Sequence, residues 1–485
     1  MVIRRVVLVA VVFAFTISCA VGPNYERPPV SAPDQYYPEK TEAEARSLAD
    51  LPWWRVFDDS LLVNLIEEAL GNGYDARIAA ARVEEARARY GIAQSQFFPQ
   101  VDYQAGFQRG RQNQIVNPSK PTQSAWTLQA NLSWELDLWG RIRRLSESAN
   151  AGYFATEEAR RGVLLSLVSD VATAYFELRE LDAELEIAKR TVQAFQETLD
   201  LFSRRLEGGA ASGLETARAE AALGTVAAQI PELERAIVGK ENQINYLLGR
   251  NPQPILRETP MPPLPPAIPA GLPSQLLERR PDVREAEQLL VAANANIGVA
   301  KANFFPTISL TGLLGAVSPQ LSNLFSNSGT WSIAAGLVGP LFQGGRITAE
   351  YKAAKAQWQQ VRVQYEATVT NAFGEVSTAL IDRAKLVDTV HQRTRTTEAY
   401  QEAVRLANIR YLSGLASYFE VLEAQQQLFP AENALVQSKR DQFLAVVKLY
   451  RALGGGWKFE AGAPMAAAPM PAQGQAEAPP MKEKP

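Results

Sequence analysis

The sequence repeats itself once, at a spacing of 205 to 207 residues. The tripeptide Phe-Phe-Pro at 97–99 returns at 304–306. An arginine, a glycine, an alanine, a serine and a glutamate within 205–215 return at matching positions within 410–420. This spacing is far longer than the roughly 20–50 residues of a solenoid repeat. The chain is therefore expected to be one body made of two similar halves.

Two segments in each half alternate between apolar and polar residues. In the first half they are 101–108 and 126–138, and in the second half they are 308–314 and 331–337. Alternation with a period of two predicts strands with one apolar face. The opposite face carries polar residues, among them Asp102, Gln129, Glu135, Asp137 and Ser332. Each half thus predicts a β-hairpin.

A very long helical pattern follows each hairpin. Residues 141–206 and 346–412 contain no proline. At about 1.5 Å per residue, each segment would span about 100 Å as a helix. A glycine- and serine-rich turn comes next, and a returning helix closes each half. Proline removes a helical hydrogen bond, so Pro231 and Pro430 predict kinks in the returning helices.

The N-terminus has the pattern of a secretory signal peptide, with two arginines, an apolar run and a small residue within 1–18. Cys19 follows at once and is the only cysteine, so no intrachain disulfide can form. Its position resembles a bacterial lipoprotein site, where the thiol is acylated. An ordinary buried cysteine and a short membrane anchor are the alternatives. Ala20, in place of an aspartate, favours sorting to the outer membrane.

Changes in composition divide the chain into six parts. They are a signal peptide (1–18), a lipidated, proline-rich extended arm (19–58), the first repeat (59–250), a stiff proline-rich linker (251–273), the second repeat (274–457) and a disordered tail (458–485).

The composition also excludes several classes of function. The net charge is −3, so the chain lacks the basic footprint of a nucleic-acid partner. His391 is the only histidine, and with one cysteine the chain cannot build a His/Cys metal cluster. It carries no phosphate loop, dinucleotide fingerprint or nucleophile elbow. We expect no enzyme, and no cofactor apart from a covalent lipid on Cys19.

The predicted strands are long enough to cross a membrane, which takes about 9–11 residues. One chain supplies only four strands, whereas the smallest membrane barrels need about eight, and lipid does not tolerate open strand edges. Several chains must therefore share one barrel, and three chains would give twelve strands. Alternation alone would also suit two hairpins packed on a soluble core. The secretory signal and Cys19 favour the membrane.

Five motifs along residues 19–457 are specific enough to indicate a family. They are CAVGPNYERPPV at the start of the arm, the two Phe-Phe-Pro junctions, LLERRPDVREAE (276–287), PLFQGGRI (340–347) and RYLSGLASYFEVLEAQQQL (410–428). Together they resemble the outer-membrane factor family of tripartite efflux systems, which has the TolC fold. The most similar branch is the OprM-like and NodT-like lipoproteins that work with RND-type pumps. The resemblance implies an α+β membrane protein that forms a homotrimer, with a twelve-stranded β-barrel (four strands per chain) continuous with a long periplasmic α-helical barrel.

The resemblance also implies a function. The chain would be a lipid-anchored, passive exit duct for drugs and small molecules in the outer membrane of a Gram-negative bacterium. Its partners would be a periplasmic adaptor, an inner-membrane RND-type transporter and the lipid of the outer membrane. The alternatives are a duct for metal ions or secreted polypeptide, and a structural coiled-coil surface lipoprotein.

Two sets of site residues follow from the same resemblance. Arg383, Tyr411 and Glu423 are expected near the helix tips of the second half, where they would form a periplasmic gate. In the first half Glu423 corresponds to Arg218, so this gate chemistry is expected in one copy only. Adaptor docking is expected at the tip turns, on Gly209, Ser212, Gly213, Gly414 and Ser417. The alternatives are ordinary exposed helix charges and simple interhelical turns.

Overall fold

The computed structural model describes residues 20–30, 32–33, 36–37, 48, 56, 59–110, 122–209, 212–257, 264, 273–326 and 328–455. The predicted signal peptide, Cys19 and the predicted tail lie outside these residues, as do most of the arm and most of the linker. The chain forms two compact units, and each combines segments of both repeats. The strand unit comprises Met1–Asp34, Ala79–Gly162 and Pro273–Gly374, and the helical unit comprises Gln35–Ile78, Val163–Leu272 and Glu375–Pro485.

The two repeats give the same order of elements, which is helix, hairpin, long helix and returning helix. In chain order the main elements are α3 (Ser60–Asn72), α4 (Tyr74–Ser95), β1 (Gln100–Gly110), β2 (Gln123–Leu136), α5 (Arg141–Glu207), α6 (Gly213–Ala227), α7 (Gln229–Leu247), α8 (Pro273–Arg279), α9 (Pro281–Ala302), β3 (Thr307–Ser318), η2 (Leu321–Asn323), β4 (Gly329–Val338), α10 (Arg346–Leu412) and α11 (Tyr418–Ala452).

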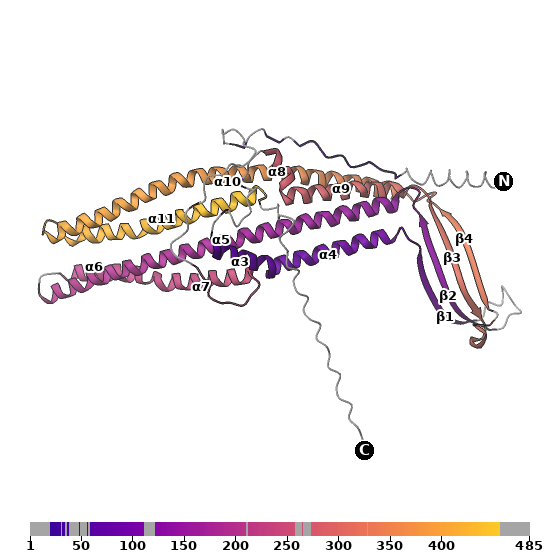
Figure 1. Ribbon diagram of the computed structural model, residues 1–485, viewed down its shortest axis with the longest axis horizontal. Coiled ribbons are helices and arrows are strands. Elements are labelled where there is room, and N and C mark those ends of the chain that lie inside the picture. Colours follow the sequence, from indigo (N-terminus) through magenta and orange to yellow (C-terminus); the bar gives the residue numbers. More distant parts are fainter. Residues whose placement is uncertain are drawn as a thin grey trace, which may run out of the picture. The chain divides into compact units, whose positions relative to one another are not determined.

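The four strands form one antiparallel sheet in the order β1-β2-β3-β4 (Figure 1). The hairpin of the first repeat therefore pairs directly with that of the second. One row across the sheet joins Tyr103, Ala130, Leu314 and Trp331. Tyr103, Leu314 and Trp331 are 86%, 69% and 74% exposed, so no described residue covers this apolar face. The predicted strands and their apolar face are confirmed.

The Phe-Phe-Pro motifs mark the change from helix to strand. Helix α4 ends four residues before Pro99, and α9 ends four residues before Pro306. Proline has no amide hydrogen to donate and forces the preceding residue out of helical angles. At the other end of each hairpin, Gly140 and Gly345 have φ values of 77° and 88°. Only glycine adopts such angles without strain, so the long helices can begin directly after these turns.

In the helical unit, the C-terminal parts of α5 and α10 pack with α6 and α11 around one apolar cluster. Its buried members include Phe195, Phe202, Val226, Val421 and Phe429. The return of the first repeat breaks at Ala228, three residues before Pro231, whereas α11 continues through Pro430. Of the two prolines that predict a kink, Pro231 thus lies beside a break between two helices, whereas Pro430 lies inside one continuous helix. No described helix is both long enough and apolar enough to span a membrane.

The sheet predicts a sharp difference between two glycines. A methyl group added to Gly315 in β3 would stand 2.3 Å from the carbonyl oxygen of Leu128, whereas one added to Gly329 in β4 would meet nothing within 4 Å. Gly315→Ala should therefore force β2 and β3 apart and lower the free energy of unfolding by about 1–3 kcal/mol. The measurement is the midpoint of thermal unfolding by far-UV circular dichroism. Gly329→Ala is the matched control and should be neutral; equal midpoints for the two variants would contradict the close β2–β3 packing.

Candidate functional site

The face of the sheet opposite the exposed apolar residues is largely polar or small. Its clearest row joins Gln104, Gln129, Gly315 and Thr330 across the four strands. The two amides are linked, since Gln129 Nε2 donates to Gln104 Oε1 at 3.0 Å. Such a face stays hydrated while the opposite face lies in lipid. It is the candidate wall of an aqueous path.

The start of α5 is fixed by Asp137, and here the structure corrects the sequence analysis. Strand β2 ends at Leu136, so Asp137 does not belong to the polar strand face. Its Oδ1 accepts from the backbone N of Ile142 and its Oδ2 from that of Arg143, both at 2.9 Å. The first amides of a helix have no partner within the helix, so a carboxylate that accepts from them caps the helix. Asp137 therefore belongs to the start of α5, although it continues the alternating pattern of β2.

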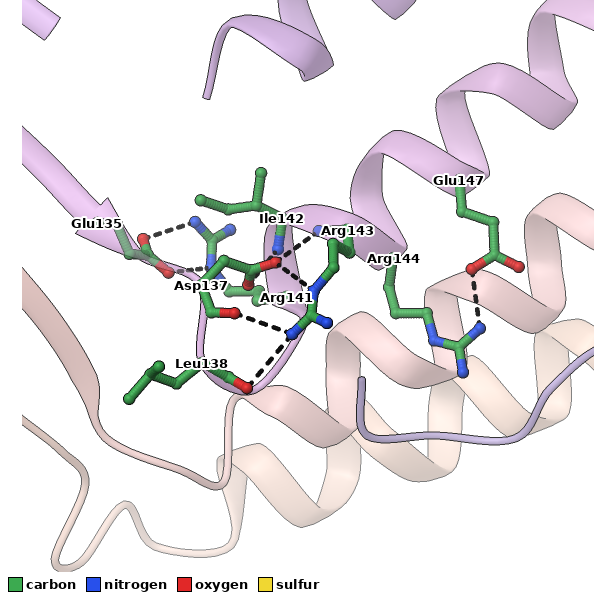
Figure 2. Close-up of polar contacts among 8 residues, drawn as sticks. All are labelled: Glu135, Asp137, Leu138, Arg141, Ile142, Arg143, Arg144 and Glu147. Atoms are coloured by element: carbon green, nitrogen blue, oxygen red, sulfur yellow. Dashed lines mark hydrogen bonds and ion pairs between the residues drawn. The ribbon is translucent and has the colours of Figure 1, made fainter. Parts of the chain in front are cut away.

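Two arginines complete this junction between strand and helix (Figure 2). Arg141 donates to both carboxylate oxygens of Glu135, at 2.9 and 2.7 Å. This bidentate contact raises the pKa of Arg141. Arg143 Nη2 donates to the carbonyl oxygens of Asp137 and Leu138, at 3.0 and 3.3 Å. The charged contacts hold α5 in a fixed direction relative to β2.

The N-terminal arm docks at the same junction. The backbone N of Val21 donates to the carbonyl oxygen of Trp139 at 3.0 Å. Gly22 has a φ of 116°, and a methyl group on it would stand 2.5 Å from Gly298 Cα in α9. Two glycines thus allow the arm to lie directly on the helix. Ala20 lies just as directly against Gly140, a glycine at the base of the sheet. The residue that follows Cys19 is therefore placed at the base of the sheet.

Aromatic rings gather at this end of the strands. Trp139 stacks on Phe305 with ring centroids 4.7 Å apart, and its Nε1 donates to the carbonyl oxygen of Pro306 at 2.7 Å. Trp134 Nε1 donates to the carbonyl oxygen of Phe97 at 3.0 Å. Tryptophans with a satisfied N–H are typical of the interface between membrane and water.

The two tip turns of the helical unit share one design. Gly209 and Gly414 both have a φ of 71° and end α5 and α10. Ser212 and Ser417 are the N-caps of the returning helices, and Gly213 is the first residue of α6. Added methyl groups at these three glycines would meet nothing within 4 Å. The turns are therefore open on their outer side.

Tyr411 links the two helix pairs near the tips. Its hydroxyl is hydrogen-bonded to Arg205 Nη1, and the Arg205 guanidinium lies 5.4 Å from the centre of its ring. Its ring also packs edge-on against Tyr418, with centroids 5.3 Å apart. Burial raises the pKa of Tyr418, whose hydroxyl donates to Thr198 Oγ1 at 2.8 Å. A tyrosine of the second repeat is thus held by a helix of the first.

Arg383 does not lie where the sequence analysis expects it. It precedes Tyr411 by 28 residues in the uninterrupted helix α10, which separates the two by about 42 Å. The expected placement near the tip is therefore wrong. Glu423 is exposed and lies in the second turn of α11. The structure does not bring Arg383, Tyr411 and Glu423 together within one chain.

Two of the arginines near the tips are Arg205 and Arg410. Arg410 Nε donates to Glu420 Oε2 at 3.2 Å. The sequence contains a signal for both, since they occupy equivalent positions of the repeat. Their contacts across the helices could not be inferred from that equivalence. Among the described residues, no group of three or more histidine, cysteine, aspartate or glutamate side chains could hold a metal ion.

The model of a protein family described as outer membrane efflux protein matches this chain twice, over residues 65–250 and 272–455. The chain belongs to this family. Each match coincides with one sequence repeat to within a few residues. The family resemblance inferred from the five motifs is thereby confirmed.

Individual relatives align with nearly the whole length of this chain. The probable efflux pump outer membrane protein TtgC of Pseudomonas putida is 36% identical over 456 residues, which cover 92% of this chain and 94% of that protein. The cation efflux system protein CusC of Escherichia coli is 35% identical over 447 residues, which cover 91% and 96%. Among solved structures, the outer-membrane channel OprN superposes with a TM-score of 0.83 at 32% identity and covers 90% of this chain and 100% of that one.

Family membership explains how the open edges of the sheet are satisfied. Three chains supply twelve strands to one β-barrel, which continues into a periplasmic barrel of helices. The efflux protein lies in the outer membrane, with its apolar strand face toward lipid and its polar face toward the lumen. It acts there as an exit channel of an efflux pump.

Proposed function

We propose that this efflux protein is the passive duct through which drugs and other small molecules pass from the periplasm to the exterior. An inner-membrane transporter of the RND type supplies the energy, and a periplasmic adaptor joins it to the helix tips. The observation that carries the proposal is the two-faced sheet, since a barrel closed from it has a wet interior through which small molecules can diffuse. Metal cations are a second candidate cargo, because CusC is named for cation efflux.

The tip turns offer a surface for the adaptor. Leu214, Leu412 and Leu415 lie beside the turns and are 62%, 81% and 71% exposed. Exposed apolar residues next to open glycine turns are typical of a protein interface. The docking residues predicted from the sequence, Gly209, Ser212, Gly213, Gly414 and Ser417, lie in these same turns and would allow the partner's backbone to approach closely.

A charge at this surface should abolish efflux without changing the channel. In a strain that lacks the gene, the parental protein should restore growth in antibiotics and dyes, and Leu415→Asp should fail to do so. Leu256→Asp is the matched control, because Leu256 is 79% exposed but lies outside the tip turns. The measurement is the inhibitory concentration for antibiotics, dyes, and copper and silver salts. Full resistance with Leu415→Asp would exclude docking at this turn. If the parental protein restores tolerance to the metal salts alone, cations are the cargo.

We also propose that Tyr411 and Glu423 belong to a periplasmic gate, with Arg205 in place of Arg383. The Arg205–Tyr411 contact holds α10 against α5, so its loss frees the second helix pair to move. Three copies of Glu423 around the axis would repel one another unless arginines or bound cations lie between them. The gate therefore combines two parts. One is the Arg205–Tyr411 contact within each chain, called the lock below, and the other is the ring of Glu423 carboxylates from the three chains.

Breaking the lock should open the channel more often. A hydrogen bond at the protein surface contributes about 1 kcal/mol, so Tyr411→Phe or Arg205→Ala should raise the open probability roughly fivefold. Planar-bilayer recordings of purified channels measure it. Arg204→Ala is the matched control, because the hydrogen bond that Arg204 donates among the described residues goes to the backbone of its own helix. In the same recordings, Glu423→Gln should weaken the preference for cations. A Tyr411→Phe channel that gates like the Arg204→Ala channel would contradict the lock.

Finally, we propose that Cys19 carries the lipid anchor. The support is the position of Ala20, which lies against Gly140 at the base of the sheet, next to the backbone hydrogen bond from Val21 to Trp139. Acyl chains on the preceding residue would enter the membrane at the level of the aromatic rings.

Cys19→Ser should remove all incorporation of labelled palmitate, because the chain has no second cysteine. Cells fed with labelled palmitate and an immunoprecipitation of the protein provide the measurement. Unchanged label on the Cys19→Ser protein would refute the proposed site.

A further inference from the structure

A cleft in the strand unit lies between the N-terminal arm and two helices. It has a volume of about 620 Å³. Residues 22–29 of the arm form one side, and α9 and α10 form the others. Hydrogen bonds hold the arm over the cleft, since Asn294 Nδ2 donates to the carbonyl oxygen of Pro23 at 3.0 Å and Arg27 Nη2 donates to Glu287 Oε2 at 2.8 Å. The cleft is therefore a built feature of the fold.

The lining of the cleft is positively charged. It contains Arg27, Lys301, Lys355 and Arg362, against one carboxylate, Glu26. Arg27 and Arg362 have carboxylate partners within the chain. Lys301 and Lys355 form no ion pair with any residue that the structure describes. Glu26 is thus the one carboxylate that faces these two ammonium groups in the cleft, and the Lys355 ammonium also lies 5.8 Å from the centre of the Tyr351 ring.

A third donor comes from Trp358, which also lines the cleft. Its Nε1 is buried and has no hydrogen-bond partner among the described residues. A buried donor without an acceptor is costly, by about 1–3 kcal/mol, so this N–H is available to an acceptor that enters the cleft. Tyr351, Lys355 and Trp358 follow one another at spacings of four and three residues, which places them on one side of α10.

The cleft lies at the depth of lipid headgroups. Lys301 precedes the first residue of β3 by six positions, and Phe304 packs against Tyr351 with ring centroids 6.0 Å apart. The next residue, Phe305, belongs to the aromatic group at the base of the sheet. The donors therefore stand just on the periplasmic side of the membrane, where the phosphates of the periplasmic leaflet are found.

We propose that this cleft binds the phosphate group of an anionic phospholipid, held by Lys301, Lys355 and the indole N–H of Trp358. A phosphate diester accepts several hydrogen bonds and carries one negative charge, which two lysine ammonium groups can share. Basic pockets at membrane boundaries bind acidic headgroups by the same chemistry. The bound lipid would fasten the arm and α10 to the leaflet at a site separate from Cys19. The proposal rests on the location in the outer membrane and not on the proposed gate or cargo.

The test is native mass spectrometry of the purified, delipidated trimer titrated with phosphatidylglycerol or phosphatidylcholine. Phosphatidylglycerol should bind more tightly, and Lys301→Gln with Lys355→Gln should weaken its binding roughly tenfold to thirtyfold. Lys352→Gln with Lys439→Gln is the control of equal charge, since both lysines are exposed and neither lines the cleft. Trp358→Phe keeps an aromatic side chain but removes the indole N–H, and it should weaken binding roughly tenfold.

Three results would overturn the proposal. The first is equal phosphatidylglycerol binding by the cleft variant and the control variant. The second is lysine-dependent binding of inorganic phosphate without retention of lipid, which would assign the site to free phosphate. The third is dissociation of the cleft variant into monomers with unchanged lipid binding per chain, which would show that the lysines face a neighbouring subunit.

Discussion

Backbone hydrogen bonding is the constraint on which the rest of this structure depends. In lipid no water can satisfy an unpaired N–H or C=O, so a sheet that crosses the membrane cannot keep open edges. The four strands of one chain leave β1 and β4 as edges, and no arrangement of one chain can close so short a sheet. Assembly is therefore a condition for insertion into the membrane. Three chains with four strands each satisfy the requirement with twelve strands.

The duplication of the sequence serves the same constraint. Each repeat contributes one hairpin, and the register of β2 and β3 places most apolar residues of one face opposite one another, as in the pairs Ala130–Leu314, Trp134–Leu310 and Leu136–Ile308. The long helices α5 and α10 begin directly after equivalent glycines, Gly140 and Gly345. The helices therefore repeat in the same way as the hairpins do. The tips depart from this symmetry. Tyr411 of the second repeat is held by Arg205 of the first, and the reverse contact cannot form because Leu206 occupies the position equivalent to Tyr411.

Local patterns predicted most of the fold. Alternation gave the strands and their two faces because side chains on a strand point to opposite sides with a period of two. The absence of proline predicted α5 and α10, each of 67 residues. The same methods failed where a residue's role depends on distant partners. Asp137 continues the alternation but caps a helix, and Arg383, which the family resemblance places at the tip, precedes Tyr411 by 28 positions in one helix. The cleft around Trp358 joins three segments that are far apart in the sequence, and no local pattern indicates it.

The central claim is that β1 of one chain pairs with β4 of its neighbour in a closed ring of three. A photoreactive benzoylphenylalanine in place of Tyr103, which lies on the exposed face of β1, would test this claim directly in outer membranes. After irradiation, the account predicts covalent products no larger than a trimer, with the cross-linked peptide from residues 329–338 of the neighbouring chain. Products larger than a trimer, or cross-links that map only within the same chain, would contradict it.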